Sequence, residues 1–541
     1  MKAAAVERIE LPMAELEALL ARAKAALDEK DYALLRKLVD AHLYLTSQIE
    51  DERTTIRWLR ELLGVQTSEK TRKVLARAGV TGGSGAETPG TSASRETKGS
   101  KAKGHGRRGA QGYPGAEKIA VAHESLKLGD RCPECQKGKV YQQKKPALII
   151  RVVGQAPLSA TVYGLQRLRC NLCGEVFTAK PPAGVGEAKY DATAAAMIAV
   201  LKYGSGLPFN RLAGLQGSLG VPLPASTQWD IVEESAAELK PVYEELVREA
   251  AQGEVLYNDD TGMKVLELMK EERQEEEAGE VSPERTGVFT SGIVSTRQGR
   301  RIALFFTGRR HAGENLKEVL SRRAAELAAP IQMCDALSRN LPKELEVILA
   351  NCLAHGRRRF VDVVENFPEE CRHVLEILKE VYKNDAIARE RQLGPEERLR
   401  FHQAESAPWM EKLHGWMTEQ FETKQAEPNS GLGTAITYML RHWEKLTLFL
   451  RKAGAPIDNN ICERALKKVI LHRKNALFFK TTNGAHVGDL FMSLIHTGQL
   501  SDVDPFDYLT QLLRHATALA HNPRDWMPWN YRETAATTPG H

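Results

Sequence analysis

Within residues 254–355, three β-type segments are followed by a helix, a strand, a second helix and a last strand, and this order limits the folds open to this chain. The first three β-type segments are EVLYNDDTGMKVLEL, GVFTSGIVST and RRIALFFTGR, with an acidic loop, KEERQEEEAGEVSPER, in the first turn. Next come an amphipathic helix (GENLKEVLSRRAAELA), a short apolar strand (PIQMCDA), a second helix (LSRNLPKELE) and a last strand (VILANCLAH). Three meandering strands followed by alternating helices and strands predict a mixed sheet in an α/β domain.

This order of elements is that of a ribonuclease H-like core, in which functional groups sit at the ends of adjacent strands. Asp259 and Asp260 lie in the first strand, and Asp335 ends the fourth. We expect these two strands to be neighbours, so that the acids lie close together. A structural role stays open for each acid, because Asp-Asp-Thr at a strand end often forms a turn and Asp335 could cap the next helix.

A further acid lies in the stretch PIDNNICERALKKVILHRKN, residues 456–475, where apolar residues recur at helical spacing. Glu463 could complete a capping box with Asn460 or pair with Lys467 one turn later, and both roles are structural. Alternatively, Glu463 is a metal ligand, and the basic residues after it hold a phosphate backbone. Those basic residues are Arg464, Lys467, Lys468, Arg473 and Lys474.

Acids placed on this order of elements predict a site for two Mg²⁺ ions, held by Asp259 or Asp260 together with Asp335 and Glu463. Carboxylate oxygens are hard ligands that suit Mg²⁺, and Mn²⁺ is the alternative ion. In a two-metal site, one ion activates the attacking water or hydroxyl and the other stabilises the leaving oxygen. The expected chemistry is therefore phosphodiester cleavage, and the expected partner is DNA.

Two Cys-x-x-Cys pairs, CPEC and CNLC, are separated by β-prone runs within residues 119–185. This pattern is typical of a zinc ribbon, in which four thiolates complete a closed tetrahedral site for one structural Zn²⁺. The predicted zinc ligands are Cys132, Cys135, Cys170 and Cys173. A pair of redox-active dithiols is the alternative.

The first 118 residues predict an oligomerisation segment followed by a tether. Residues 1–77 are predicted to be helical, with an a/d seam over four heptads that favours a coiled coil between protomers over packing within one subunit. The seam comprises Leu35, Leu38, His42, Leu45, Ile49, Glu52, Ile56, Leu59 and Leu63. Residues 78–118 are rich in Gly, Ser, Thr and Pro, which predicts a disordered linker. The basic residues of this linker could contact a DNA backbone, or the linker could be only a solvated tether. These residues are Lys101, Lys103, Arg107 and Arg108.

The remaining regions complete the predicted organisation. The catalytic core spans residues 253–356, and the other regions are a helical, DNA-binding candidate at 186–252, a helical insertion at 357–455 and the rest of the core with the tail at 456–541. The 541-residue chain has a net charge of only +5, so local basic clusters matter more than total charge. We find no signal peptide and no apolar run of membrane-spanning length, which predicts a cytoplasmic protein.

Several motifs resemble the transposases of the bacterial insertion sequence 66 family. The most specific are YNDDTGMKVL, NCLAHGRRRF and PIDNNICERALKKVILHRKNALFF. Segments that look like other parts of the family are LRELLGVQTSEK, GHGRRG, LKYGSGLPFNRL, PFDYLTQLL and MPWN. The resemblance covers most of the chain. It implies a DDE-type DNA transposase with a ribonuclease H-like catalytic core and a helical insertion.

The resemblance assigns the two catalytic aspartates to Asp259 and Asp335 and the catalytic glutamate to Glu463, so Asp260 is an accessory candidate. The family usually has Glu where this chain has Asp260, and often has Gly and a later Tyr where this chain has DALSRN. The implied partners are the element ends, the target DNA, further copies of the chain, and accessory proteins encoded by the element. The implied location is the cytoplasm, with association to the nucleoid when DNA is bound.

A Cys-x-x-His motif occurs near the start of the helical insertion in several DDE families. Cys352 and His355 match its spacing, so they are accessory site candidates. A buried cysteine and a helix-capping histidine are the structural alternative.

Two other functions stay open at the level of sequence. One is a zinc-ribbon DNA-binding regulator that has lost catalysis, and the other is a nuclease that cuts DNA without joining it. Strand cleavage in Mg²⁺ separates the regulator from a transposase, and insertion products separate the nuclease from a transposase.

Overall fold

The computed structural model describes the greater part of the chain from residue 155 onward. The described residues are 155–169, 176–186, 188–277 and 287–538, with a few short stretches between 22 and 139. The predicted coiled-coil seam, the basic linker residues and the four predicted zinc ligands lie outside the described residues. The chain divides into two compact units, residues 1–81 with 364–372, and residues 82–363 with 373–541, and the second contains the sheet.

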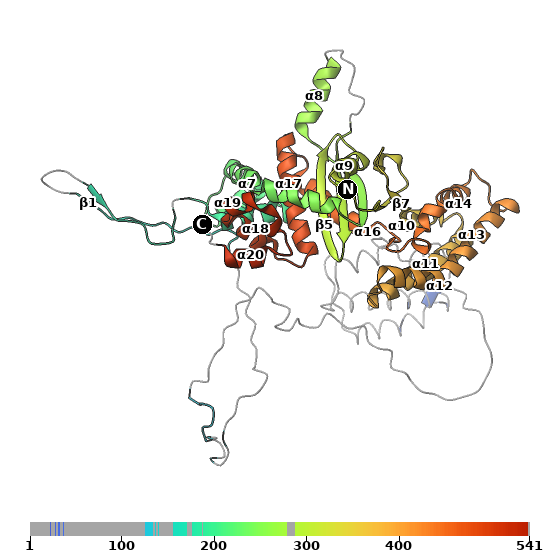
Figure 1. The fold of residues 1–541 in the computed structure, drawn as a ribbon, viewed down its shortest axis with the longest axis horizontal. Coiled ribbons are helices and arrows are strands. Elements are labelled where there is room, and N and C mark those ends of the chain that lie inside the picture. Colours follow the sequence, from blue (N-terminus) through green and yellow to red (C-terminus); the bar gives the residue numbers. More distant parts are fainter. Residues whose placement is uncertain are drawn as a thin grey trace. The chain divides into compact units, whose positions relative to one another are not determined.

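A five-stranded mixed sheet lies within the larger unit (Figure 1). Its strands are β3 (Val255–Gly262), β4 (Phe289–Arg297), β5 (Arg300–Gly308), β6 (Ile331–Cys334) and β7 (Ile348–Asn351). The strand order is β5-β4-β3-β6-β7, with β5, β4 and β3 antiparallel and β3, β6 and β7 parallel. The predicted mixed sheet is confirmed, and so is the predicted adjacency of its first and fourth strands.

Two details of the predicted order are wrong. The segment LSRNLPKELE forms only the short 3-10 helix η3 (Ser338–Asn340), because Pro342 lacks an N–H and disfavours helical geometry at the residue before it. The acidic loop is partly helical, since α8 (Leu266–Glu277) extends into it. Glu, Lys and Arg are good helix formers, and their exposure does not oppose a helix.

Helices cover both faces of the sheet. Helix α16 (Asn460–Ala476) packs on one face of β3 and β4, and α9 (Ala312–Leu320) packs on the other. Helix α7 (Ala225–Ala251) contacts α9, β4 and β5. Apolar residues from the sheet and these helices form one buried cluster, which holds the strands in place.

Helix α17 (Thr482–Leu500) covers the edge strand β5, as Figure 1 shows. Three of its polar residues, spaced four apart, face this edge. Asp489 accepts the Thr307 N–H, while the hydroxyls of Ser493 and Thr497 accept the N–H groups of the alternate strand residues 305 and 303. The helix therefore satisfies backbone donors that an open edge would offer to another chain.

The predicted helical regions that the structure describes, at 188–252 and 357–455, are helical. Residues 188–252 contain α5 (Ala192–Ala199), the π-helix η2 (Val200–Gly204), α6 (Phe209–Ser218) and α7. The insertion contains α10 (Leu353–Val363), α11 (Pro368–Glu390), α12 (Pro395–Glu405), α13 (Ala407–Glu422), α14 (Gly431–Arg441), α15 (Trp443–Leu446) and the 3-10 helix η4 (Leu448–Leu450). Beyond α17 lie α18 (Pro505–Arg514), α19 (Ala516–His521), η5 (Pro523–Trp526) and α20 (Tyr531–Thr537).

A small antiparallel hairpin precedes these helices. Its strands are β1 (Arg167–Arg169) and β2 (Val176–Thr178), and they flank the second predicted cysteine pair in the sequence. Among the described residues, none of the helices has the length and apolar content that crossing a membrane requires.

Candidate active site

Asp259 and Asp335 lie next to each other at the carboxyl edge of the sheet. Strands β3 and β6 are parallel, and Tyr257 pairs in register with Met333. Asp259 and Asp335 each lie two residues beyond this pair. Because side chains on a strand alternate between the faces, both carboxylates point to the same face of the sheet.

Helix α16 brings Glu463 to this face. Gly292 of β4 is the register partner of Asp259, and a Cβ atom on Gly292 would lie 3.0 Å from the Leu466 side chain. The glycine therefore allows α16 to approach the strand closely. The Cys462 thiol donates to the Gly292 carbonyl at 3.3 Å, and Glu463 follows it in the first turn of the helix.

Burial and neighbouring carboxylates set the charge state of Asp259. Burial is the largest effect, and repulsion from Asp335, Asp260 and Glu463 adds to it, which raises the pKa of Asp259 to about 7. A hydrogen bond from the Asp260 N–H to Asp259 Oδ1, at 2.8 Å, acts in the opposite direction. A divalent cation among these oxygens would relieve the repulsion.

Asp260 points to the opposite face of β3, and its side chain is only 1% exposed. One carboxylate oxygen lies 2.9 Å from His311 Nδ1, and the other lies 3.3 Å from Arg339 Nη2. His311 is the N-cap residue of α9, and Arg339 lies in η3, just after Asp335. The two adjacent aspartates, which are chemically alike in the sequence, thus have different partners.

A buried network of amide side chains joins the segments that carry the acids. Gln332 Nε2 donates to Asn258 Oδ1 at 2.9 Å, and both side chains donate to the Asn340 carbonyl. Asn459 Nδ2 donates to the Asn258 carbonyl at 3.1 Å, and Asn340 Nδ2 donates to Asp335 Oδ1. Strand β3, the loop after β6 and the start of α16 therefore share one set of hydrogen bonds.

Sequence reasoning missed these amides, although a signal was present. Asn258 and Gln332 interrupt strand segments that are otherwise largely apolar, and both side chains are fully buried. A buried polar side chain needs hydrogen-bond partners, so such an interruption indicates a network. The partners themselves come from distant segments, and only the structure identifies them.

The predicted capping box of Asn460 and Glu463 is wrong. Asn459 is the N-cap residue, and its side chain donates to the Asn258 carbonyl instead of capping the helix. The Asn460 N–H binds Asp458 Oδ1 at 3.1 Å. Because the helix begins at Asn460, Glu463 is its fourth residue, one position beyond that of a capping-box acid.

Cys352 and His355 lie close to Glu463 where β7 leads into α10. The Cys352 sulfur, a ring nitrogen of His355 and a carboxylate oxygen of Glu463 all lie within 4.8 Å of one another. The expected buried cysteine is also present, since Cys352 is fully buried and burial raises the pKa of its thiol to about 12. The predicted Cys-x-x-His pair and the predicted glutamate thus meet in one cluster.

The basic residues of α16 do not all face solvent. Arg473 Nη1 contacts the Gly262 carbonyl and lies 3.3 Å from Thr261 Oγ1, so it ties the helix to the end of β3. The other basic residues of this helix, all exposed or half-buried, are Arg464, Lys467, Lys468 and Lys474. These four are better placed than Arg473 to contact a phosphate backbone.

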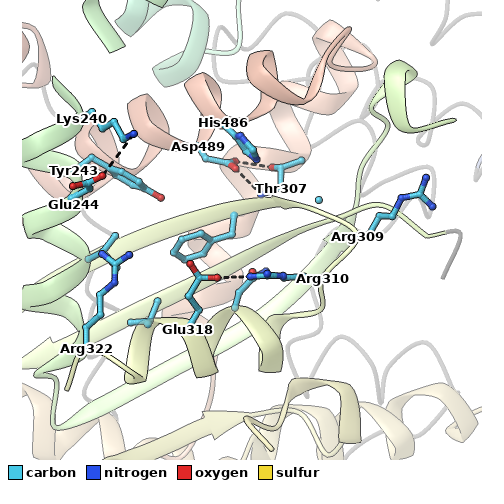
Figure 2. Close-up of a pocket in the computed structure, with 15 residues that line it drawn as sticks. Lys240, Tyr243, Glu244, Thr307, Arg309, Arg310, Glu318, Arg322, His486 and Asp489 are labelled. Carbon is cyan, nitrogen blue, oxygen red and sulfur yellow. Dashed lines mark hydrogen bonds and ion pairs between the residues drawn. The ribbon is translucent and has the colours of Figure 1, made fainter. Parts of the chain in front are cut away.

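A separate pocket of about 580 Å³ is lined by residues of α7, β5, α9 and α17 (Figure 2). Its lining includes the Asp489 carboxylate, which accepts the Thr307 N–H at 2.6 Å and the Thr307 hydroxyl at 2.7 Å. Arg310 and Glu318 in the lining form an ion pair. The acid cluster around Asp259 is the stronger candidate site, because several carboxylates act on Asp259 and, in the part of the chain described, only Asp260 among them pairs with cationic side chains.

Comparison with protein families gives one match. A model described as "Transposase IS66 family" matches residues 188–487, more than half of the chain. The matched range includes Asp259, Asp335 and Glu463, together with Cys352 and His355.

Similar proteins occur in Sinorhizobium fredii. The protein named "Uncharacterized protein y4jD" is 29% identical over 385 residues, which cover 68% of this chain and 71% of that protein. "Uncharacterized protein y4hP" is 27% identical over 357 residues, covering 62% of this chain and 61% of that protein. "Uncharacterized protein y4qI" is 25% identical over 354 residues, covering 63% and 62%.

Proposed function

Because this chain belongs to the transposase IS66 family, we propose that it is a DDE-type DNA transposase that cuts the ends of its insertion sequence and joins them to target DNA. The observation that carries the proposal is the convergence of Asp259, Asp335 and Glu463 on one face of the sheet, where they repel one another. The strand order β5-β4-β3-β6-β7 supports a ribonuclease H-like core.

The three acids fit a pair of Mg²⁺ ions, or Mn²⁺ ions in their place. The donors are carboxylate oxygens, which hard cations prefer. Burial is the main cause of the raised pKa of Asp259, and cations would relieve the repulsion from neighbouring carboxylates that adds to it. Bound ions would activate the attacking hydroxyl and stabilise the leaving oxygen. Asp259, Asp335 and Glu463 would hold them.

Other side chains of the chain position these ligands. Asn258 donates to the Asn340 carbonyl and Arg339 pairs with Asp260, so two contacts fix the loop after β6 against β3. Within that loop, Asn340 donates to Asp335. Asp260 is therefore a positioning residue in this proposal, not a metal ligand. The N-cap residue Asn459 connects α16, and with it Glu463, to the same network.

DNA binding follows from the proposed activity. The exposed basic residues of α16 would contact phosphates, and so would the linker residues Lys101, Lys103, Arg107 and Arg108. The seam from Leu35 to Leu63 would associate protomers, because two element ends must be held together. One Zn²⁺ held by the two cysteine pairs would stabilise the segment 119–185. Binding of genomic DNA would place the protein on the nucleoid.

Four single variants test the proposal in assays of element-end binding and strand cleavage. We expect Asp259→Asn, Asp335→Asn and Glu463→Gln to abolish cleavage and to retain binding, because binding comes from distributed phosphate contacts. Asp260→Asn should retain part of the cleavage activity. If Glu463→Gln cuts at the normal rate, Glu463 is not the third ligand, and Asp458, which binds the Asn460 N–H nearby, is the next candidate.

The two alternatives give different results in the same assays. A DNA-binding regulator would bind element ends and cut none of them in Mg²⁺ or Mn²⁺. A nuclease would produce nicks whose 3′-hydroxyls never join target DNA.

A further inference from the structure

Two helix starts meet beside the acid cluster. Cys352 directly precedes α10, His355 lies in its first turn, and Glu463 lies in the first turn of α16. The Leu353 N–H donates to the Ile457 carbonyl at 3.0 Å, which fixes one helix start against the other. One sulfur, one nitrogen and one oxygen donor are thereby held within 4.8 Å of one another.

One hydrogen bond to the Cys352 sulfur favours a metal-bound thiolate. The sulfur accepts the Asn459 N–H at 3.2 Å, and amide donors of this kind stabilise negative charge on sulfur. The sulfur is fully buried, so its hydrogen-bonding environment is set by the protein and not by water.

The His355 ring supplies an independent observation. Its Nδ1 atom is buried and has no hydrogen-bond partner among the residues that the structure describes. Buried ring nitrogens normally have a partner, and an orphan one calls for a ligand that the protein chain does not provide. A metal ion bound between His355, Cys352 and Glu463 would be such a ligand.

The donor set selects the class of metal. Sulfur and imidazole ligands favour Zn²⁺ and related transition metals over Mg²⁺, which prefers oxygen alone. Ligand atoms around a tetrahedral zinc lie about 3.3–3.8 Å apart, given bonds of about 2.0–2.3 Å. The present separations, up to 4.8 Å, therefore require only small side-chain adjustments. Three protein ligands leave a fourth position open to water.

We propose that Cys352, His355 and Glu463 bind one transition-metal ion of the Zn²⁺ class. Binding displaces the thiol proton of Cys352 to solvent, so the ligand is the thiolate. The consequence rests on the proposed function: a Glu463 carboxylate held by this ion is withdrawn from the Mg²⁺ site, and strand cleavage is inhibited.

Cobalt binding to the full-length protein tests the site directly. Co²⁺ replaces Zn²⁺ and gives a thiolate-to-metal charge-transfer band that Mg²⁺ cannot give. The predicted cysteine pairs would also bind such ions, so all proteins in this test carry serine in place of Cys132, Cys135, Cys170 and Cys173, and the remaining site is titrated. We expect one Co²⁺ with a thiolate band in this background, and loss of the band in Cys352→Ser.

A matched control separates ligand loss from a change in folding. Cys462→Ser removes another fully buried thiol, next to Glu463, and should leave the band unchanged. His355→Gln, at a partly exposed position, should weaken Co²⁺ binding at least about tenfold while the circular dichroism stays that of the parent. An equal band and equal affinity in Cys352→Ser and His355→Gln would overturn the proposal.

Cleavage assays then separate this proposal from the proposed function. In Mg²⁺, added Zn²⁺ should inhibit cleavage by the parent, and the inhibited fraction should be smaller for His355→Gln relative to its own activity without Zn²⁺. If no protein cleaves DNA in Mg²⁺, the transposase proposal fails, and the cobalt titration still decides the metal site.

Discussion

Asp259, which is half-buried, and Asp489, which is buried, have the same raised pKa, about 7, for different physical reasons. Asp489 is raised by burial alone, and two hydrogen bonds from Thr307 partly oppose the shift. Asp259 is raised by burial and also by the carboxylates of Asp335, Asp260 and Glu463. A shifted pKa therefore does not identify a functional site by itself, and the charges of its neighbours must be considered.

The difference indicates two roles. Asp489 completes the edge of the sheet, because it accepts backbone and hydroxyl donors of β5 that would otherwise be unpaired. Asp259 has like charges around it and accepts a hydrogen bond from the Asp260 N–H. The Asp489 carboxylate finds its hydrogen-bond donors within the protein chain, whereas the repulsion around Asp259 favours binding of a cation.

The largest expected effect is on catalysis. Asp259→Asn should lower strand cleavage by about 10³-fold or more, since it removes a ligand from the proposed cation site. Asp489→Asn should cleave at nearly the parent rate, because an amide oxygen can still accept the Thr307 N–H. Single-turnover cleavage of element-end DNA measures both. Equal losses in the two variants would remove the functional distinction between the two aspartates.

The next effect is on folding. Asp489→Leu should lower the free energy of unfolding by about 1–3 kcal/mol, because it leaves the buried Thr307 donors unpaired. Asp259→Leu should not show a comparable loss, since it relieves repulsion among the acids. Urea unfolding without divalent ions measures both variants. Greater destabilisation by Asp259→Leu would mean that Asp259 is held by contacts that stabilise the fold.

The pH dependence of stability sharpens the comparison further. A carboxyl whose pKa is raised on folding binds more protons in the folded state than in the unfolded state. For Asp259 and Asp489, the raised values of about 7 mean that stability falls as pH rises from about 4 to about 7, then levels off. Mg²⁺ should abolish the contribution of Asp259 and leave that of Asp489.

Urea titrations between about pH 5 and pH 8, with and without Mg²⁺, check this expectation. Without Mg²⁺, the stability of the Asp259→Asn protein should depend less on pH than that of the parent. With Mg²⁺ present, the two proteins should show the same pH dependence of stability. An Mg²⁺ effect on pH dependence that survives in Asp259→Asn would place the bound cation elsewhere.

A smaller effect is expected at the neighbour of Asp259. Asp260→Asn should reduce cleavage by roughly tenfold, because it weakens the contacts of β3 to His311 at the start of α9 and to Arg339 in the loop after β6. Its Mg²⁺ requirement should stay close to that of the parent. If Asp260→Asn instead needs far more Mg²⁺, then Asp260 acts on the ions directly.

The smallest effect concerns the basic face of α16. Lys467→Ala should weaken binding to all DNA sequences alike and should reduce the salt-dependence slope by about 1, if this exposed lysine contacts one phosphate. Arg473→Ala is the matched comparison, because Arg473 already contacts Gly262 and should change the slope less. Fluorescence anisotropy at several salt concentrations measures both. Identical slopes in the parent and Lys467→Ala would remove α16 from the DNA interface.

Much of the sheet follows from sequence patterns. Apolar runs and turn residues predict the five strands and their order, and that order predicts that Asp259 and Asp335 lie at one edge. The position of Glu463 does not follow from periodicity, since the same spacing suits a capping box. Its assignment came from resemblance, and the close approach of α16 over Gly292 supplies the physical basis.

Other features depend on contacts between distant segments. The helix expected in LSRNLPKELE is replaced by the short 3-10 helix η3. Its residue Asn340 donates to Asp335 and accepts hydrogen bonds from Asn258 and Gln332. Local propensity cannot reveal such partners, because they arise only once β3 and β6 are paired. Strand alternation puts Asp259 and Asp260 on opposite faces of the sheet. Which of the two faces α16 depends on how the strands and helices pack, and the local sequence does not specify this packing.

The central claim is that Asp259, unlike Asp489, belongs to a cation site. Binding of Mn²⁺, followed by electron paramagnetic resonance of the free ion, tests it in three proteins: the parent, Asp259→Asn and Asp489→Asn. The account predicts that the parent and Asp489→Asn bind Mn²⁺ alike and that Asp259→Asn loses this binding. Mn²⁺ binding that is unchanged in Asp259→Asn, or lost only in Asp489→Asn, would contradict it.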